Sequence, residues 1–168
     1  TAPRKAMLRS LTTDVLRYGK VFTTEARAKE VRKIVEPLIA LAAKEKDNFE
    51  TLTVKAKVAR KDANGKRVKE VVDGKKVTVY DEVDKEIRKD KPSRQHARRQ
   101  IAAVLYNQTE VPTKAAGRKK NTKLVDLTAK LLDEVAPKYA TRNGGYTRIV
   151  KIGLRKGDAA MEVLLELV

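Results

Sequence analysis

Apolar residues in the first third of the chain recur at intervals of three or four, the spacing that places them on one face of an α-helix. This pattern predicts a first helix over residues 5–18, with Gly19 directly after it, where glycine commonly ends a helix. A second helix, capped by a threonine at 23–24, is predicted from the apolar stripe over residues 28–41. Pro37 lies inside that stripe, so we expect a kink or a short break there.

The same spacing predicts two more helices in the second half of the chain. The third helix is capped by Ser93 and covers residues 94–106. The fourth is capped at 121–122, follows an apolar stripe over residues 124–135, and ends at Ala136-Pro137.

Strand patterns occupy the middle and the end of the chain. Residues 49–91 show Val-rich alternation interrupted by Asn64-Gly65 and Asp73-Gly74, both preferred two-residue hairpin turns. They predict a three-stranded meander over residues 52–61, 66–72 and 75–80. Near the C-terminus, residues 146–152 and 161–168 predict the two strands of a hairpin.

The predicted fold class is therefore α+β, with helices packed against a C-terminal antiparallel β-hairpin and with an inserted small β-meander. Residues 1–48 and 92–168 are expected to form a core domain, and residues 49–91 an extension. The extension has a net charge of +4 and the remaining residues +13. A lower charge is expected of an insertion that lies outside the main contact with a polyanion.

Composition restricts the function classes. The chain has 168 residues, a net charge of +17 and a pI near 10.1, a charge that repels itself unless a polyanion is close. With no Cys and with His96 as the single histidine, thiolate zinc sites, disulfides and histidine metal clusters are excluded. No apolar run reaches membrane-spanning length, so we expect a cytosolic protein without a membrane partner. The sequence has no glycine-rich phosphate loop after a predicted strand, so we expect neither a cofactor nor a small-molecule substrate. Because Thr1 stands where Met would start a chain, we expect that processing or truncation removed a segment.

Several basic segments are candidates for phosphate contact. The polar face of the first helix carries Arg4, Lys5, Arg9 and Arg17. The third helix has Arg94, Arg98 and Arg99 in its first turns, where the helix dipole favours anions, so a polyanion would relieve the repulsion. Residues 112–121 (PTKAAGRKKN) include Arg118, Lys119 and Lys120. They are either a flexible phosphate-seeking arm, which we favour, or a solvated linker.

Residues 140–150 (ATRNGGYTRIV) form the most informative segment. The tripeptide Asn143-Gly144-Gly145 tolerates positive φ, so the backbone can turn sharply and approach a ligand closely. Arg142 and Arg148 flank this turn with guanidinium groups suited to phosphate, and the Tyr146 ring can stack on ribose or base. The alternative is a loop with solvated charges.

Two rival functions remain open at this point. An RNA-modifying enzyme could use Asp158, Glu162 and Glu166, but the two glutamates alternate with apolar residues and fit the solvent face of a strand. His96 fits a helix surface near RNA better than a catalytic role. A nucleoid protein that compacts DNA is compatible with the charge alone.

Three strings in this order resemble the L seventeen family of bacterial large-subunit ribosomal proteins. They are RKAMLRSLTTDVLRYGKVFTTEARAKEVRKIVEPLIALA (4–42), HARRQIAAVLYN (96–107) and LLDEVAPKYATRNGGYTRIVKIGLRKGD (131–158), followed by a final LLELV. The strings cover about three-fifths of the chain, and their ordered coincidence makes the resemblance specific.

The resemblance implies a non-enzymatic constituent of the large (50S) subunit that binds and stabilises folded 23S rRNA. It also implies neighbouring ribosomal proteins, among them the member of the L thirty-two family. The residues of RNA-contacting basic elements that it carries over are Arg4, Lys5, Arg9, Arg98, Arg99, Arg142, Tyr146, Arg148, Arg155 and Lys156.

The chain departs from the family pattern in three places. Family members usually begin with a basic tail ahead of the position of Thr1. Residues 49–91 have no counterpart in short members, and residues 109–123 are longer than usual.

Overall fold

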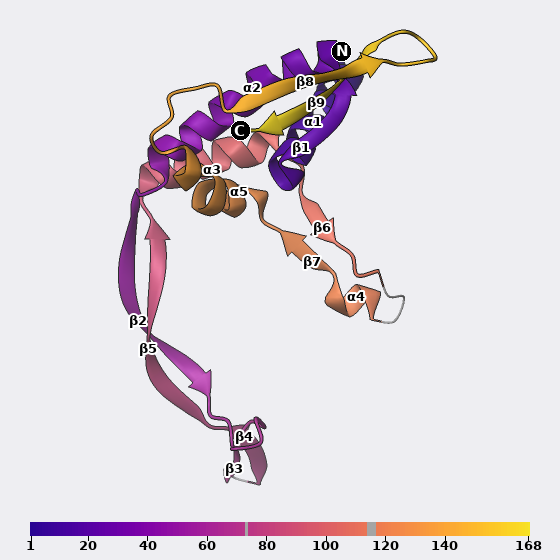
Figure 1. The fold of residues 1–168 in the computed structure, drawn as a ribbon. Helices are drawn as coiled ribbons and strands as arrows, with labels where there is room; N and C mark the ends of the chain where they lie inside the picture. The colour runs from indigo at the N-terminus through magenta and orange to yellow at the C-terminus, as the bar shows by residue number, and fades with distance from the viewer. Residues whose placement is uncertain (73, 114–116) are drawn as a thin grey trace. The chain divides into compact units, whose positions relative to one another are not determined.

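The computed structural model of the chain describes residues 1–72, 74–113 and 117–168. These divide into two compact units, a core unit of Thr1–Asn48 with Pro92–Val168 and an insertion unit of Phe49–Lys91 (Figure 1). The predicted α+β class is confirmed, because both helices and antiparallel strands are present.

The core unit begins with α1 (Ala2–Tyr18), β1 (Lys20–Thr24) and α2 (Glu25–Glu45). After the insertion come α3 (Pro92–Val104), β6 (Gln108–Glu110), α4 (Arg118–Asn121), β7 (Lys123–Val125) and α5 (Leu127–Lys130). A π-helical turn (Leu131–Val135) and a 3-10 turn (Ala136–Tyr139) extend α5, and β8 (Thr147–Leu154) and β9 (Met161–Leu167) complete the unit.

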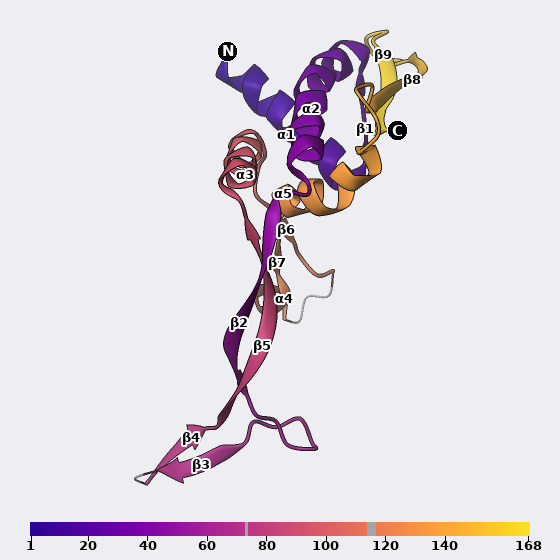
Figure 2. The same ribbon diagram turned by 90° about the vertical axis from the view of Figure 1, so that its left-hand side faces the viewer.

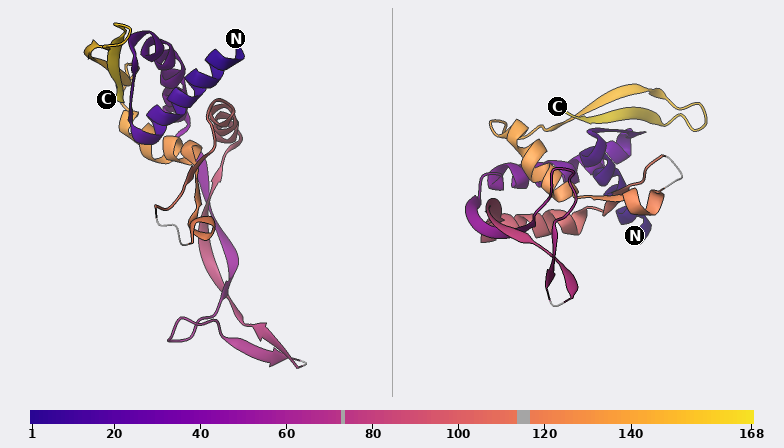
Figure 3. Two further views of the ribbon diagram at one scale, coloured as in Figure 1. Left: turned by 90° about the vertical axis from the view of Figure 1, so that its right-hand side faces the viewer. Right: turned by 90° about the horizontal axis from the view of Figure 1, so that it is seen from below.

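Helix α2 lies at the centre of the core unit. It contacts α1, α3, the π and 3-10 turns and all three strands β1, β8 and β9. Figures 2 and 3 show the sheet and α3 on opposite sides of α2. Its buried side chains are Ala28, Val31, Val35, Leu38, Ile39 and Ala42. Burial of this stripe is the main apolar contribution to the core.

Helix α2 runs through Pro37 without interruption, so the predicted break does not occur. A proline inside a helix removes one backbone hydrogen bond, in this case to the carbonyl of Lys33. Val35 and Leu38, on either side of Pro37, are buried, and their packing holds both halves of the helix in place. The apolar contacts outweigh the lost hydrogen bond.

The predicted C-terminal hairpin is confirmed, and the structure adds a third strand to it. The strand order is β1-β9-β8, with all neighbours antiparallel. The central strand β9 buries Val163 and Leu165 completely. Strand β1 has only five residues between two helices, and their burial does not alternate regularly, so no strand pattern marks it in the sequence.

The two helices predicted in the first third of the chain are confirmed. The predicted caps of the two later helices are wrong, and so is the predicted start of the last one. Gly19 adopts φ +79° and ends α1, as predicted. Helix α3 starts at Pro92, so Ser93 lies inside it and donates to Glu45 Oε2 at 2.9 Å instead of capping. Helix α5 starts after Asp126, whose side chain accepts the Ala129 N–H at 2.9 Å, because residues 123–125 pair as strand β7 with β6.

Side chains of α1 bind the C-terminal end of α3. Arg9 donates from Nε to the Val104 carbonyl at 2.8 Å and from Nη2 to the Leu105 carbonyl at 2.7 Å. Its guanidinium also lies 4.2 Å from the centroid of the Tyr106 ring. The buried Thr13 hydroxyl accepts the Tyr106 N–H at 3.1 Å. These contacts satisfy backbone groups that a helix end leaves without partners.

The insertion unit is a two-stranded ribbon with a forked end. Strands β2 (Phe49–Ala59) and β5 (Tyr80–Asp90) pair over their whole length, from Phe49↔Asp90 to Ala59↔Tyr80. The shorter strands β3 (Lys69–Val72) and β4 (Lys75–Thr78) form a separate hairpin. The predicted pairing of residues 66–72 with 75–80 is confirmed by the β3–β4 hairpin. The predicted three-stranded meander is wrong, because residues 52–59 pair with β5, which was not predicted, and not with the strand that follows them. Strand β5 was missed because its sequence, YDEVDKEIRKD, is mostly charged and neither face of it is buried.

The two predicted hairpin turns lie at this forked end. At Asn64-Gly65 the turn is closed by Asp62, whose Oδ1 accepts the Asn64 and Lys66 N–H groups at 3.1 and 2.8 Å. Gly65 has φ +73°, whereas Asn64 does not adopt positive φ. The Asp62 N–H bonds to the Lys66 carbonyl at 2.9 Å, so the loop has three residues, 63–65, and not the two that were predicted. At the second turn Gly74 also has φ +73°, whereas Asp73 lies outside the described residues.

We predict that Arg9→Ala lowers the free energy of unfolding by about 2 kcal/mol, because charged hydrogen bonds to two carbonyls are lost. Urea unfolding of the full chain measures this. Lys5→Ala, an exposed cation of the same helix, is the control and should change stability by less than about 0.5 kcal/mol. Equal losses in both variants would contradict the role of Arg9.

The connection between β8 and β9 contains a pH-sensitive contact. Arg155 donates to both carboxylate oxygens of Asp158 at 2.8 and 2.6 Å, and this lowers the pKa of Asp158 to about 2. We predict a carboxyl titration midpoint near 2 by NMR, with Asp158→Asn identifying the signal. Because the folded pKa is below that of the unfolded chain, the stabilisation is present above pH 4 and lost as pH falls towards 2. A midpoint near 3.8 would contradict the contact.

Candidate nucleic-acid interface

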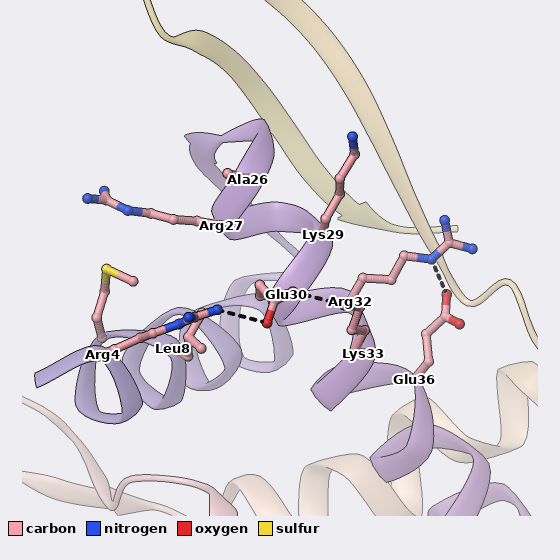
Figure 4. A pocket seen from close by; sticks show the side chains of 10 residues that line it. Arg4, Leu8, Ala26, Arg27, Lys29, Glu30, Arg32, Lys33 and Glu36 are labelled. Carbon is pink, nitrogen blue, oxygen red and sulfur yellow. Dashed lines mark hydrogen bonds and ion pairs between the residues drawn. The ribbon is translucent and has the colours of Figure 1, made fainter. Parts of the chain in front are cut away.

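A groove of about 810 Å³ separates the N-terminal half of α1 from α2 (Figure 4). Met7, Leu8 and Ala26 supply apolar side chains to it. The charged side chains that line it are Arg4, Arg27, Lys29, Arg32, Lys33, Glu30 and Glu36. Five cations against two carboxylates make this groove a basic surface with an apolar component.

The cations of this groove are held by ion pairs that remain open to solvent. Arg4 and Lys33 both contact Glu30, at 3.1 and 2.9 Å, and Arg32 contacts Glu36 at 3.1 Å. The bond from Lys33 is the main cause of a lowered pKa at Glu30. Exposed pairs of this kind contribute little to stability, so their cations can turn to phosphate groups at small cost.

Of the groove's cations, only Arg4 was predicted from the sequence. The α2 cations were not predicted, because the apolar stripe of α2 identifies only the buried face of that helix. A signal was present: Arg27, Glu30 and Lys33 recur every three residues on the opposite face.

The Asn143-Gly144-Gly145 corner adjoins this groove. Gly144 and Gly145 have φ +102° and +62°, as predicted, while Asn143 does not adopt positive φ. A Cβ added at either glycine would meet nothing within 4 Å, so a ligand backbone can approach there. Asn143 and Gly144 line a second hollow, of about 590 Å³, together with Lys33 and Glu36 of the first groove. The groove and the corner therefore form one surface, which we call the α2 surface.

Glu36 ties the corner to α2. Its Oε1 accepts from the Thr147 hydroxyl at 2.9 Å and from Arg32 Nε at 3.1 Å. The first residue of β8 is thereby fixed to the polar face of α2. Arg148, the next residue, is exposed and lies 3.6 Å from Glu166 across the strand pair, and Arg142 is also exposed. Both arginines remain available to a ligand.

Tyr146 has a structural place, and the prediction that its ring stacks on ribose or base is wrong. The side chain is 5% exposed and belongs to the apolar core. Its ring meets Tyr139 edge-on at 5.2 Å between centroids, and its hydroxyl donates to the Arg142 carbonyl at 3.0 Å. The sharp turn at Gly144-Gly145 directs the aromatic ring inward, which the pattern of residue types did not reveal.

Arg94 is likewise a structural residue, and its predicted RNA contact is wrong. It is 3% exposed. Its guanidinium donates to the Lys46 carbonyl at 2.5 Å and to Asp133 Oδ1 at 2.6 Å. This arginine links the end of α2 to α3 and to the π-helical turn, so its charge is compensated inside the core.

The other predicted cations of α3 lie on the surface. Arg98 contacts Asp126 Oδ2 at 2.9 Å and remains 37% exposed, and Arg99 is exposed. Both line a hollow of about 350 Å³ with Tyr106, Asn107 and the start of α5. These two arginines form a second basic location on the core unit.

The segment predicted as a flexible basic arm, residues 112–121, lies between two paired strands and contains one helical turn. Strands β6 and β7 pair, and α4 forms one helical turn in which the Asn121 and Thr122 N–H groups bond to Gly117 and Arg118 at 2.9 Å. Arg118, Lys119 and Lys120 lie on this turn and are exposed. Residues 114–116 of the predicted arm lie outside the described residues. Arg17 of α1 donates to Oε1 of Gln108, the first residue of β6, at 2.5 Å.

The remaining candidates are distributed over the core unit. Lys5 is exposed on α1, while Arg9 is bonded to α3, which is a structural reason for its presence. Arg155 is bonded to Asp158, and this pair raises the arginine pKa, whereas Lys156 beside it is exposed. The structure thus brings Arg4 and the glycine corner onto the α2 surface and leaves the α3, β6–β7 and β8–β9 locations separate.

Catalytic and metal chemistry find little support in the described part of the chain. Within residues 1–72, 74–113 and 117–168, no three His, Cys, Asp or Glu side chains are grouped as metal ligands. Asp158, one of the carboxylates of the rival enzyme hypothesis, is bonded to Arg155. Among the described residues, no helix has both the length and the apolar character needed to cross a membrane.

Comparison with known proteins agrees with the resemblance found in the sequence. Residues 7–168 match the family described as "Ribosomal protein L17". The "Large ribosomal subunit protein bL17" of Lachnospira eligens is 73% identical over 168 residues, covering 100% of this chain and 94% of that protein. The proteins of the same name from Acetivibrio thermocellus and Lysinibacillus sphaericus are 45% and 37% identical, again over 100% of this chain and over 94% and 93% of theirs. This chain therefore belongs to the L seventeen family of bacterial ribosomal proteins, structural components of the large ribosomal subunit.

Proposed function

We propose that this chain binds and stabilises folded 23S rRNA within the large ribosomal subunit and that its role in translation is architectural. As a member of a large-subunit family, it acts on the ribosome in the cytoplasm. The observation that carries the proposal is the α2 surface, where exposed cations surround an apolar groove and an open glycine corner.

The geometry of the α2 surface suits a folded polyanion. Exposed cations supply phosphate contacts that determine position and affinity, while the backbone at Gly144-Gly145 allows close approach. Arg142 and Arg148 stand beside that corner and suit bidentate phosphate contact. Arg98, Arg99, Arg118, Lys119, Lys120 and Lys156 provide further contacts from the other locations. Binding at several separate locations would hold neighbouring rRNA helices together.

The proposal includes no turnover. A catalytic site needs a nucleophile, a base and an orienting group within hydrogen-bond reach, and the carboxylates weighed for this role serve other contacts or lie along a strand. A nucleoid function is disfavoured by membership of a ribosomal family. The neighbour from the L thirty-two family, which the sequence resemblance implies, remains a prediction.

Sedimentation of a cell lysate through sucrose at about 0.5 M salt, which strips most purely electrostatic binding, tests the proposal. We expect one copy of the chain in each large-subunit particle, because a specific site resists salt. Quantitative mass spectrometry of each fraction measures the copy number. Release into free or DNA-bound fractions would overturn the proposal.

We predict that Arg142→Ala with Arg148→Ala weakens binding to 23S rRNA and lowers the slope of log K against log salt by about one unit per lost phosphate contact. Filter binding at several salt concentrations measures the slope. Tyr146→Phe is the matched control, since it changes a buried side chain between the two arginines and should leave the slope unchanged. A slope that is also unchanged in the double variant would remove these arginines from the interface.

A further inference from the structure

The two parts of the insertion unit differ in charge. The ribbon, β2 with β5, has five Lys and Arg against six Asp and Glu, a net charge of −1. Residues 60–79, the forked end that we call the tip, have seven against three, a net charge of +4. The positive charge of the insertion, +4 over residues 49–91, therefore comes from its tip.

The register of the ribbon explains why its cations are unsuited to a polyanion. Lys55 lies opposite Asp84 and Lys57 opposite Glu82, so charges of opposite sign share one face. The other face carries two cations and two carboxylates, Lys85, Lys89, Glu50 and Asp81, among the apolar residues Leu52, Val54, Ala56, Val58, Val83 and Ile87. Because the net charge of the whole ribbon is −1, a polyanion gains little net attraction from it.

The tip presents its cations differently. Lys61, Lys66, Arg67, Lys69, Lys75 and Lys76 are all exposed. Among the described residues, none of these six has an acidic partner within ion-pair distance, whereas Arg60 contacts Asp81 at 3.1 Å. The Asp62 carboxylate is directed to backbone N–H groups of its own turn. The cations of the tip are thus concentrated and largely uncompensated.

Backbone hydrogen bonds hold the tip in one arrangement. The N–H groups of Arg60, Val68 and Val79 bond to the carbonyls of Val79, Arg60 and Val68 at 2.9, 2.9 and 3.1 Å. This junction joins the loop of Asp62 to the β3–β4 hairpin. A preorganised cationic end loses less conformational entropy on binding than a disordered one.

We infer that the tip, residues 60–79, is a second RNA-binding site, separate from the surfaces of the core unit, and that the ribbon is its spacer. The inference rests on the proposed function, because it requires the chain to be bound to the ribosome. Eleven residues per strand span about 35 Å, so the tip contacts phosphates at that distance from the base of the ribbon. From the sequence, the whole insertion was expected to lie outside the main contact with a polyanion. Under this inference, that expectation holds for the ribbon and not for the tip.

Charge removal in matched sets tests the inference. The tip variant carries Lys61→Gln, Lys66→Gln, Arg67→Gln and Lys69→Gln. The ribbon variant, which removes the same number of charges, carries Lys55→Gln, Lys57→Gln, Lys85→Gln and Lys89→Gln. In binding of the full chain to transcribed 23S rRNA, we expect the tip variant to lower the salt slope by about two to four units and the ribbon variant to lower it by less than one. Equal effects of both variants, or no effect of the tip variant, would overturn the inference.

The same assay separates this inference from the proposed function. If the slope falls in the Arg142 and Arg148 double variant but not in the tip variant, the tip proposal fails and the core proposal stands. If wild-type chain shows no specific binding to 23S rRNA, the proposed function fails.

Site-directed crosslinking identifies the partner of the tip directly. The chain has no cysteine, so Ala63→Cys places a single thiol in the exposed Asp62 turn for a photoreactive label. Thr53→Cys, exposed on the ribbon, is the control. In assembled large subunits, we expect label at position 63 to crosslink to 23S rRNA in much higher yield than label at position 53. Crosslinks from position 63 to a protein alone would overturn the assignment of RNA as the partner.

Discussion

Burial of helix α2 is the interaction on which the core unit depends. Its apolar stripe contacts the sheet on one side and α3 on the other, and α1 and the C-terminal turns complete the enclosure. A fully buried aliphatic side chain such as Ile39 contributes about 2 kcal/mol, so the stripe dominates the apolar core. Because its inner face is fully used, the polar face of α2 is left to carry the cations of the groove.

The arginines of this chain serve two physically different purposes. Arg9 and Arg94 use their planar donors to satisfy helix-end carbonyls and a carboxylate within the fold. Others, such as Arg142 and Arg148, project from the surface and remain available to phosphate. Both uses follow from the same guanidinium geometry, so residue type alone does not separate them. The net charge indicates a polyanionic partner, but only burial shows which cations can meet it.

The insertion unit divides its charges unequally between its two parts. Its ribbon carries nearly equal numbers of positive and negative charges, whereas its tip gathers exposed cations around two tight turns. The glycines of the two turns, at φ +73°, permit the sharp reversals that produce the compact end.

The sequence by itself determined the α+β class, the helices around Leu8 and Val35, the left-handed Gly19 and the C-terminal hairpin, because each leaves a local periodicity or turn signal. The ordered family strings also determined the family. Only the tertiary structure decided the partners of short or charged strands, since β1 pairs with β9 and β5 with β2 across long stretches of chain. It also decided that Tyr146 and Arg94 are buried, because burial depends on what packs against a residue, and neighbours in space are not encoded in any local pattern.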